Sequence, residues 1–147
     1  MVVDFGTSTN VDAVGPDGQF LGGALAPGVE VSLEALANRA AQLRSVELSV
    51  PTHAIGKNTV AALQSGLVLG FAGLVDGLVT RIASEIVAQF GSAPVVVATG
   101  GLSPLVVDSC RSIGEREPDL TVHGLRLAFE RSQAADRHPQ NRRPASP

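Results

Sequence analysis

Aromatic residues and cysteines are scarce in this chain of 147 residues. It has no Trp, no Tyr, five Phe and a single Cys. That residue, Cys110, cannot form a disulfide within the chain, so its cysteine content does not indicate an oxidising compartment. No basic segment followed by an apolar run opens the sequence, as a secretory signal would. We therefore expect a cytoplasmic protein.

An excess of positive charge is also lacking. Eleven Lys and Arg against 14 Asp and Glu give a net charge of -3, and the basic residues are scattered. Nucleic acids and anionic membranes both attract clustered Lys and Arg, so we expect neither as a partner. His53, His123 and His138 lie far apart in the sequence, which argues against a zinc site.

Hydrophobic residues make up 44% of the chain, enough to build the core of one domain. Its first part reads as an antiparallel meander, with strands at Val2–Phe5, Val11–Val14 and Gln19–Ala24. The residues from Gly6 to Asn10 are small and polar, so we expect a loop there. Gly15-Pro16-Asp17-Gly18 is typical of an ordinary surface turn.

Two helices are predicted next. Apolar residues recur at helical spacing from Val29 to about Leu43, and residues 44–56 read as a loop with one short strand. A second, much longer helix starts after Asn58, a good N-cap, and reaches about Gln89. The apolar residues expected on one face of it are Val60, Leu63, Leu67, Phe71, Leu74, Leu78, Ile82 and Ile86.

The long helix contains a run, Val60–Val79, that comes near the length and polarity of a membrane span. Asp76 within the run and the absence of aromatic and basic flanks oppose that interpretation. Four glycines recur in it at spacings of four and three: Gly66, Gly70, Gly73 and Gly77. Because glycine lowers helix propensity, we expect a packing reason for them, and a helix-to-helix dimer seam would supply one.

The remaining sequence adds one strand and two helices. Ala93–Thr99 is a Val-rich run typical of a strand buried on both faces, and it ends at Gly100-Gly101. Ser103-Pro104 resembles a helix start, and residues 108–119 read as a polar loop. A last helix runs to about Arg131, with Leu125 and Phe129 pointing inward. We thus predict a mixed α/β domain over residues 1–132 and a disordered tail over residues 133–147.

Three segments carry possible binding chemistry. Asp4-Phe5-Gly6-Thr7-Ser8-Thr9 joins a strand end to a turn of small residues, which suits phosphate binding but equally an ordinary hairpin turn. Gly56-Lys57-Asn58-Thr59 at a helix start resembles a Walker A loop but fails its pattern, which needs Ser or Thr directly after the lysine. It still offers a helix N-terminus for an anionic or hydroxylated ligand. Gly100-Gly101 suits a nucleotide or a plain turn.

Taken in order, these segments resemble one family, the C-terminal half of type III pantothenate kinases, over residues 2 to about 132. The matching segments are Val2–Thr7, Leu21–Gly28, Ile55–Thr59, Gln64–Gly66, Gly73–Leu78, Ala98–Gly101 and Pro118–Arg126. The resemblance implies a ribonuclease-H-like fold of the acetate and sugar kinase/actin superfamily, and a homodimer. It also implies ATP-dependent phosphorylation of pantothenate in coenzyme A biosynthesis.

The resemblance also implies roles for individual residues. Asp4 would bind a monovalent cation, potassium or ammonium, and Thr7 with Gly6 would contact the ATP phosphates, with Mg²⁺ accompanying the ATP. Gly100 and Gly101 would form the adenosine motif, and Thr59 would contact pantothenate. Oxygen ligands for a hard cation and amides for phosphate agree with these roles.

The family's first phosphate loop, Asp-x-Gly-Asn-Thr, and its Gly-x-Asp-Arg segment with the catalytic base do not occur in this sequence. No residue is therefore assigned as catalytic base, and we expect a truncated kinase that is inactive by itself. Two alternatives stay open. One is a non-catalytic domain, derived from such a kinase, that dimerises and binds nucleotide or a partner kinase. The other is a superfamily member acting on a sugar or small acid.

Overall fold

The structure, a computed structural model, describes residues 1–39 and 46–137 as a mixed α/β arrangement. The mixed α/β prediction is confirmed. The expected continuation of the first helix from residue 40 to Leu43 lies outside the described residues. The strands are β1 (Val2–Phe5), β2 (Ser8–Val14), β3 (Phe20–Pro27), β4 (Val97–Thr99) and β5 (Glu115–Arg116). The helices are α1 (Val29–Arg39), α2 (Thr59–Phe90), α3 (Ser103–Val106), the 3-10 turn η1 (Val107–Ser109) and α4 (Leu120–Arg137).

The five strands form one sheet in the order β3-β2-β1-β4-β5. β1, β2 and β3 are paired antiparallel, which confirms the predicted meander. β4 lies parallel to β1 on its other side, and β5 lies parallel to β4. Asp4 of β1 is thereby opposite Asn10 of β2 on one side and opposite Thr99 of β4 on the other.

Within the meander, β2 and β3 differ from the predicted bounds. β2 starts at Ser8 rather than Val11, so the expected loop from Gly6 to Asn10 shrinks to the two residues Gly6 and Thr7. Small polar residues hid this strand because Ser8 and Asn10 alternate with the inward-pointing Thr9, and a half-buried strand needs apolar residues on only one face. β3 continues to Pro27, three residues beyond its predicted end.

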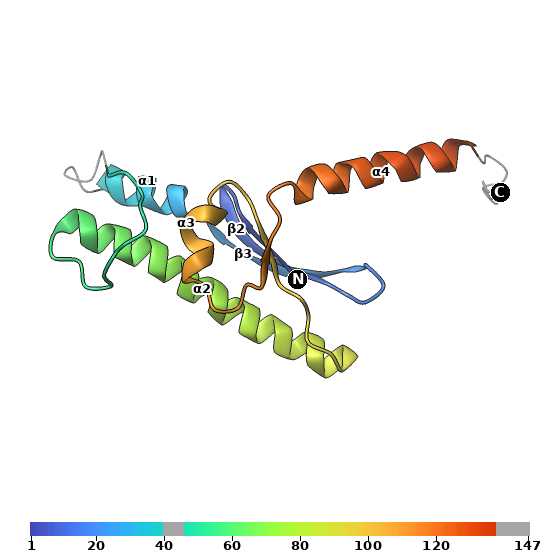
Figure 1. Cartoon of the computed structure of the whole chain (residues 1–147), viewed down its shortest axis with the longest axis horizontal. Coiled ribbons are helices and arrows are strands. Elements are labelled where there is room, and N and C mark those ends of the chain that lie inside the picture. Colours follow the sequence, from blue (N-terminus) through green and yellow to red (C-terminus); the bar gives the residue numbers. More distant parts are fainter. Residues whose placement is uncertain (40–45, 138–147) are drawn as a thin grey trace.

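The core lies between one face of the sheet and the helices. Val3 and Phe5 of β1 alternate with exposed or half-buried neighbours, and β2 alternates in the same way. The two strands thus present a continuous buried face, which packs in a cluster with α2 side chains such as Phe71 and Val75. Figure 1 shows α2 running along the sheet as the longest element of the molecule.

α2 begins where the sequence predicts. The side chain of Asn58 caps it by accepting a hydrogen bond of 2.8 Å from the amide of Ala61. Its buried face is centred differently, on Val68, Ala72, Val75 and Val79. The expected face was therefore partly wrong: Leu67, Phe71 and Ile86 are buried, but Val60 and Leu74 are exposed. This helix is apolar nearly all round, so its periodicity does not single out one face.

Among the described residues, α2 is the one helix long and apolar enough to span a membrane. Eight of its residues are buried, and the face they form packs on the sheet. Those contacts identify it as the core helix of the domain.

β4 is shorter than the predicted strand at Ala93–Thr99. β4 spans three residues, and Val95, at the start of the predicted strand, is 65% exposed. The run is continuously buried or half-buried only from Val96 onward, with Val97 half-buried, because β1, the strand it pairs with, begins opposite Val97. β5 pairs beside β4 within the stretch predicted as a polar loop. α3 begins at Ser103 with Pro104 in its first turn, as predicted.

α4 departs most from expectation. Leu125 and Phe129 were expected to point inward, but they are 67% and 64% exposed. Figure 1 shows why: α4 extends away from the sheet and the other helices. The helix runs to Arg137, past the expected end near Arg131. The division into a domain over residues 1–132 and a tail over residues 133–147 stays a prediction, with residues 138–147 outside the described part.

The half-buried carboxylate of Asp76 connects α2 to the loop before β5. Asp76 accepts hydrogen bonds from the amides of Arg111 (2.9 Å) and Ser112 (2.9 Å) and from the Ser112 hydroxyl (2.6 Å). Partial burial acts to raise the pKa of Asp76, but these hydrogen bonds and the Arg111 charge outweigh it, so that the pKa lies below its usual value. Asp76, which argued against a membrane span in the sequence, thus has a structural role.

We predict that Asp76→Ala lowers the free energy of unfolding by about 1–3 kcal/mol, because two backbone amides and a hydroxyl lose their acceptor. A carboxyl whose pKa is depressed in the folded state stabilises above its unfolded pKa, near 3.8, and this contribution fades as pH falls. Urea unfolding at pH 7 and at pH 3 measures both effects. The difference between wild type and variant should be smaller at pH 3.

Asp108→Ala is the matched control, since Asp108 is exposed and lies in the 3-10 turn just before this loop. It should change stability by less than about 0.5 kcal/mol. Equal losses in the two variants would refute a specific role for Asp76.

Candidate functional site

The candidate site lies at one edge of the sheet, where β1 and β4 end side by side. Because these neighbouring strands are parallel, their carboxyl ends meet at the same edge. Gly6 and Thr7 follow β1, and Gly100 and Gly101 follow β4. In open α/β sheets, ligands bind in the crevice outside the carboxyl ends of the strands. Four of the six residues singled out from the sequence are thereby gathered at one edge, next to Asp4.

Gly100 holds the two strand ends in close contact. Its φ of +93° lies in the region that favours glycine. A Cβ built there would overlap the Asp4 carboxylate and would lie 2.6 Å from the backbone of Phe5. The amide of Leu102 also donates a hydrogen bond of 3.1 Å to the Phe5 carbonyl. The loop after β4 therefore lies directly on the end of β1, with the Asp4 carboxylate beside it.

The turn after β1 is held from the other side by the start of α1. The amide of Gly28 donates a 3.0 Å hydrogen bond to the Thr7 carbonyl, and a Cβ on Gly28 would overlap that oxygen. The amide of Gly6 donates to the Ser8 carbonyl at 3.0 Å. The turn is thus fixed by its backbone, and the side chain of Thr7 remains exposed to solvent.

Two side-chain oxygens near this edge are buried without a partner. They are Oδ1 of Asn10, which lies opposite Asp4 in the register, and Oγ1 of Thr9. Buried polar atoms normally form hydrogen bonds, so an orphan acceptor beside a carboxylate suits a bound cation or donor. In residues 1–39 and 46–137, no group of three or more His, Cys, Asp or Glu side chains could hold a metal.

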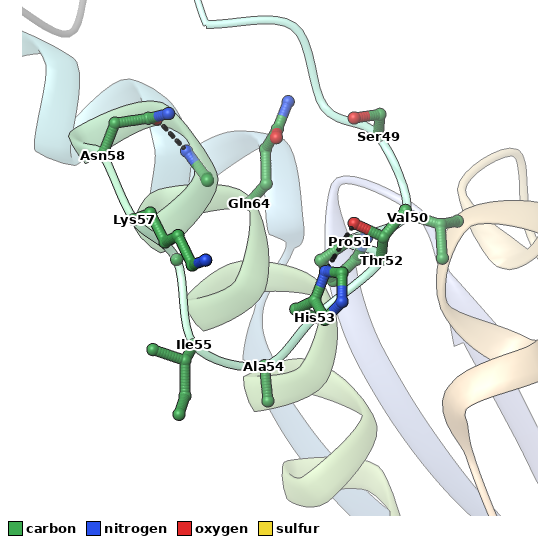
Figure 2. A pocket seen from close by; sticks show the side chains of 12 residues that line it. Ser49, Val50, Pro51, Thr52, His53, Ala54, Ile55, Lys57, Asn58 and Gln64 are labelled. Carbon is green, nitrogen blue, oxygen red and sulfur yellow. Dashed lines mark hydrogen bonds between the residues drawn. The ribbon is translucent and has the colours of Figure 1, made fainter.

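A hollow of about 820 Å³ lies between the loop of residues 49–58 and the first turns of α2. Figure 2 shows the loop bending around the helix start, with the side chains of Lys57, His53 and Gln64 beside the hollow. The hydroxyl of Thr52 lies 3.0 Å from Nδ1 of His53. The wall is mostly apolar, formed by residues such as Val50 and Ile55, and Lys57 supplies a positive charge.

Thr59, the remaining residue singled out, is the first residue of α2. It lines a smaller hollow of about 520 Å³ that shares Gly56, Lys57 and Asn58 with the larger one. None of the residues that line these two hollows belongs to the Asp4 edge. The structure therefore places Thr59 in a region of its own and does not bring it together with the four glycine and threonine positions near Asp4.

The single thiol lies away from both regions. The Sγ of Cys110 donates to the Val106 carbonyl at 3.5 Å. Burial and the nearby charge of Asp76 raise the pKa of Cys110 to about 12. Since the thiolate is the nucleophilic form, this cysteine is inert at neutral pH.

A family model for type III pantothenate kinases matches residues 1–81, more than half of the sequence. This chain belongs to the type III pantothenate kinase family. It is 59% identical over 132 residues to a type III pantothenate kinase of Saccharopolyspora erythraea, covering 90% of this chain and 50% of that protein. It is 54% identical over 147 residues to the one from Rhodococcus erythropolis, covering 99% and 53%. The chain spans about half the length of these relatives.

The fold also resembles that of a solved structure. A conserved Baf family protein from Campylobacter jejuni superposes with a TM-score of 0.63 at 19% sequence identity. The match covers 90% of this chain and 58% of that protein. At this level of identity the likeness shows the fold alone.

Sequence reasoning missed Asn10 as a member of the Asp4 edge. Asn10 was assigned to a loop, and its place opposite Asp4 follows only once β2 begins at Ser8. Thr9 and Val11 both point inward, and this period of two residues was the signal that could have revealed the strand through Asn10.

We predict that Gly100→Ala destabilises the chain by about 2 kcal/mol or more, because Ala is strained at this φ and its Cβ overlaps Asp4 and Phe5. Thermal or urea unfolding measures the loss. Gly101→Ala is the matched control, since a Cβ there has no atom within 4 Å and the φ is not positive. A Gly100→Ala variant as stable as the Gly101→Ala variant would contradict the close packing of the two strand ends.

Proposed function

We propose that this chain supplies the second half of the active site of a pantothenate kinase, which transfers the γ-phosphoryl group of ATP to pantothenate in coenzyme A biosynthesis. The observation that carries the proposal is the contact between Asp4 and the Gly100 turn at the carboxyl edge of β1 and β4. The family membership supplies the reaction. The proposed location is the cytoplasm.

We further propose the ribonuclease-H-like fold of the acetate and sugar kinase/actin superfamily. The support is the mixed sheet in the order β3-β2-β1-β4-β5, in which an antiparallel meander is followed by parallel strands. In this fold the carboxyl edge is the place where a nucleotide would bind. The likeness to the Campylobacter jejuni structure is consistent with it.

Gly6, Thr7, Gly100 and Gly101 would bind ATP. Thr7 has an exposed hydroxyl in a turn that is fixed by the hydrogen bond from Gly28. Gly101 is exposed, and no heavy atom lies within 4 Å of where its Cβ would be. A flat adenosine could therefore approach this backbone without obstruction, while the hydroxyl of Thr7 faces the phosphates.

Asp4 would hold the monovalent cation, potassium or ammonium. The support is chemical. Asp4 lies opposite Asn10 in the strand register, and the Asp4 carboxylate and the unpartnered Oδ1 of Asn10 are both oxygen ligands, which hard cations prefer. Such a cation would neutralise charge on the bound phosphates. Mg²⁺ would arrive with the ATP, and no residue of this chain is assigned to it.

Thr59 would contact pantothenate at the start of α2. The adjoining hollow offers an apolar wall and the Lys57 ammonium, which match a substrate with a carbon skeleton and a carboxylate. The hollows beside Thr59 share no lining residue with the Asp4 edge, and we propose that further protein completes the site in which the two substrates meet.

In the reaction, the primary hydroxyl of pantothenate attacks the γ-phosphorus of ATP. A new oxygen-to-phosphorus bond forms as the bond between the γ-phosphorus and the bridging oxygen breaks, and ADP leaves. The hydroxyl proton passes to a general base, a role to which we assign no residue of this chain. Phosphoryl transfer depends mostly on positioning and charge neutralisation, and the chain supplies only part of both.

A homodimer through α2 is part of the proposal. The glycines Gly66, Gly70, Gly73 and Gly77 fall on the side of the helix opposite its buried face, by the 3.6-residue period. Three of them, Gly66, Gly70 and Gly73, have no heavy atom within 4 Å of a built Cβ. A second copy of α2 could approach closely along this side. The same feature supports the alternative function, a non-catalytic domain that dimerises and binds nucleotide.

We predict that the purified chain does not phosphorylate pantothenate, because its sequence has neither the family's first phosphate loop nor the segment that carries the catalytic base. A chimera tests the proposal: this chain replaces the aligned portion of the Rhodococcus erythropolis relative, 53% of that protein. The chimera should transfer label from radioactive ATP to pantothenate, whereas the isolated chain should not exceed a blank without protein. Turnover by the isolated chain would refute the prediction. A folded chimera that binds ATP by calorimetry without turnover would favour the non-catalytic alternative.

We predict that Asp4→Asn in this chimera lowers kcat/KM about 100-fold, or ~2.7 kcal/mol, by weakening cation binding. Activity with wild-type Asp4 should depend on potassium chloride relative to choline chloride at equal ionic strength, and the variant should lose that dependence. Asp12→Asn is the control, because Asp12 lies at the other end of the same strand pair, opposite Val2. An Asp4→Asn enzyme that keeps its potassium dependence would contradict the role of Asp4.

A further inference from the structure

Three oxygen-bearing side chains lie in one row across the carboxyl edge of the sheet. Asp4 of β1 is directly opposite Asn10 of β2 on one side and Thr99 of β4 on the other. Residues directly opposite each other in neighbouring strands point to the same face, with Cβ atoms about 5 Å apart. Val3 and Phe5 point into the core, so the row lies on the opposite face of the sheet. A carboxylate, an amide and a hydroxyl are therefore neighbours there.

Two acceptor groups in this row are held close to the strand ends. Oδ1 of Asn10 is buried and has no hydrogen-bond partner. Oδ1 of Asp4 is packed between two glycine backbones, since a Cβ on Gly6 would lie 3.5 Å from it and a Cβ on Gly100 would overlap it. Acceptors on neighbouring strands repel each other unless a donor or a cation lies between them. Because a buried amide oxygen normally has a partner, this part of the row favours a bound positive charge.

We propose that Asn10, with Thr99 as a further ligand, determines which monovalent cation binds beside Asp4. The inference rests on the proposed function, which puts potassium or ammonium at Asp4. A neutral amide oxygen exerts a weaker electric field than a carboxylate, and field strength is one of the properties that distinguish potassium from sodium sites. One carboxylate and two neutral oxygens favour the larger, weakly hydrated potassium ion over sodium. A carboxylate in place of the Asn10 amide would shift the preference towards smaller ions.

A divalent cation fits the row less well. Its one carboxylate, Asp4, balances a single positive charge, whereas dedicated calcium sites in proteins use several carboxylates. The next side chain of β2 on this face, Asp12, lies opposite Val2 and therefore two residues farther from the edge. In residues 1–39 and 46–137, no cluster of three acidic, His or Cys side chains could hold a metal. The chemistry of the row thus matches a monovalent ion that also contacts the bound nucleotide.

The experiment measures binding of a non-hydrolysable ATP analogue to the Rhodococcus erythropolis chimera by calorimetry, in potassium chloride and in sodium chloride at equal ionic strength and constant MgCl₂. The unmodified chimera should bind the analogue about 10-fold more tightly in potassium. Asn10→Asp, which is nearly isosteric, should reduce this ratio to about 2-fold or less.

NMR of ²⁰⁵Tl⁺, an ion close to potassium in size, reports on the site directly and without turnover. The unmodified chimera should show a bound thallium signal that potassium displaces at lower concentration than sodium. Thr99→Val removes the hydroxyl at nearly constant volume and should weaken thallium binding about 3-fold or more. Asn10→Asp should bring the displacing concentrations of potassium and sodium close together.

Asp12→Asn is the matched control, because it also changes the charge by one on the same face of β2 but outside the row. It should leave the ratio of potassium to sodium affinities unchanged, and a change equal to that in Asn10→Asp would overturn the role of Asn10. If Asn10→Asp does not fold, Thr99→Val decides, since unaltered thallium binding in that variant would overturn the row as a cation site.

The outcomes also separate this inference from the proposed function. An unmodified chimera that binds nucleotide equally well in potassium, sodium and choline chloride, and binds no thallium, would contradict the cation role of Asp4 and this inference with it. A potassium preference that is lost in Asp4→Asn but survives in Asn10→Asp and Thr99→Val would overturn this inference alone.

Discussion

The parallel pairing of β1 with β4 is the constraint on which the rest of the structure depends. It joins two segments more than 90 residues apart in sequence, and it brings both strand ends to the same edge. Gly100 permits this approach because no other residue fits against Asp4 and the Phe5 backbone. β2 then pairs with β1 along its other edge, and α2 packs against the buried face of the sheet. The candidate nucleotide edge exists only as a product of this long-range contact.

Local sequence patterns predicted the elements that short-range chemistry determines. The Asn58 cap, the first strand, the turn at Gly15–Gly18 and the Pro104 helix start are all governed by residues within one or two turns of each other. The neighbourhood of Asp4 and Gly100 followed from family resemblance, since their contact depends on a crossover of the chain. The placement of Thr59 in a separate region could not be read from the sequence for the same reason.

The failed expectations share a physical origin as well. A helix that is apolar on most sides, such as α2, does not reveal which side the sheet will cover, so Leu74 was expected to be buried and is exposed. The inward Leu125 and Phe129 were inferred from periodicity, which identifies an apolar side but not whether anything within the chain packs on it. β5 is two residues long and depends entirely on its neighbour β4.

Asp76 gives α2 a second mechanical connection besides its packing on the sheet. Its carboxylate accepts hydrogen bonds from the amides of Arg111 and Ser112, in the segment that links α3 to β5. The row of glycines lies on the side of the same helix opposite its buried face. One helix thus connects the exposed row of glycines to the segment before β5, the strand at the border of the sheet, so the position of that border strand depends on where α2 lies.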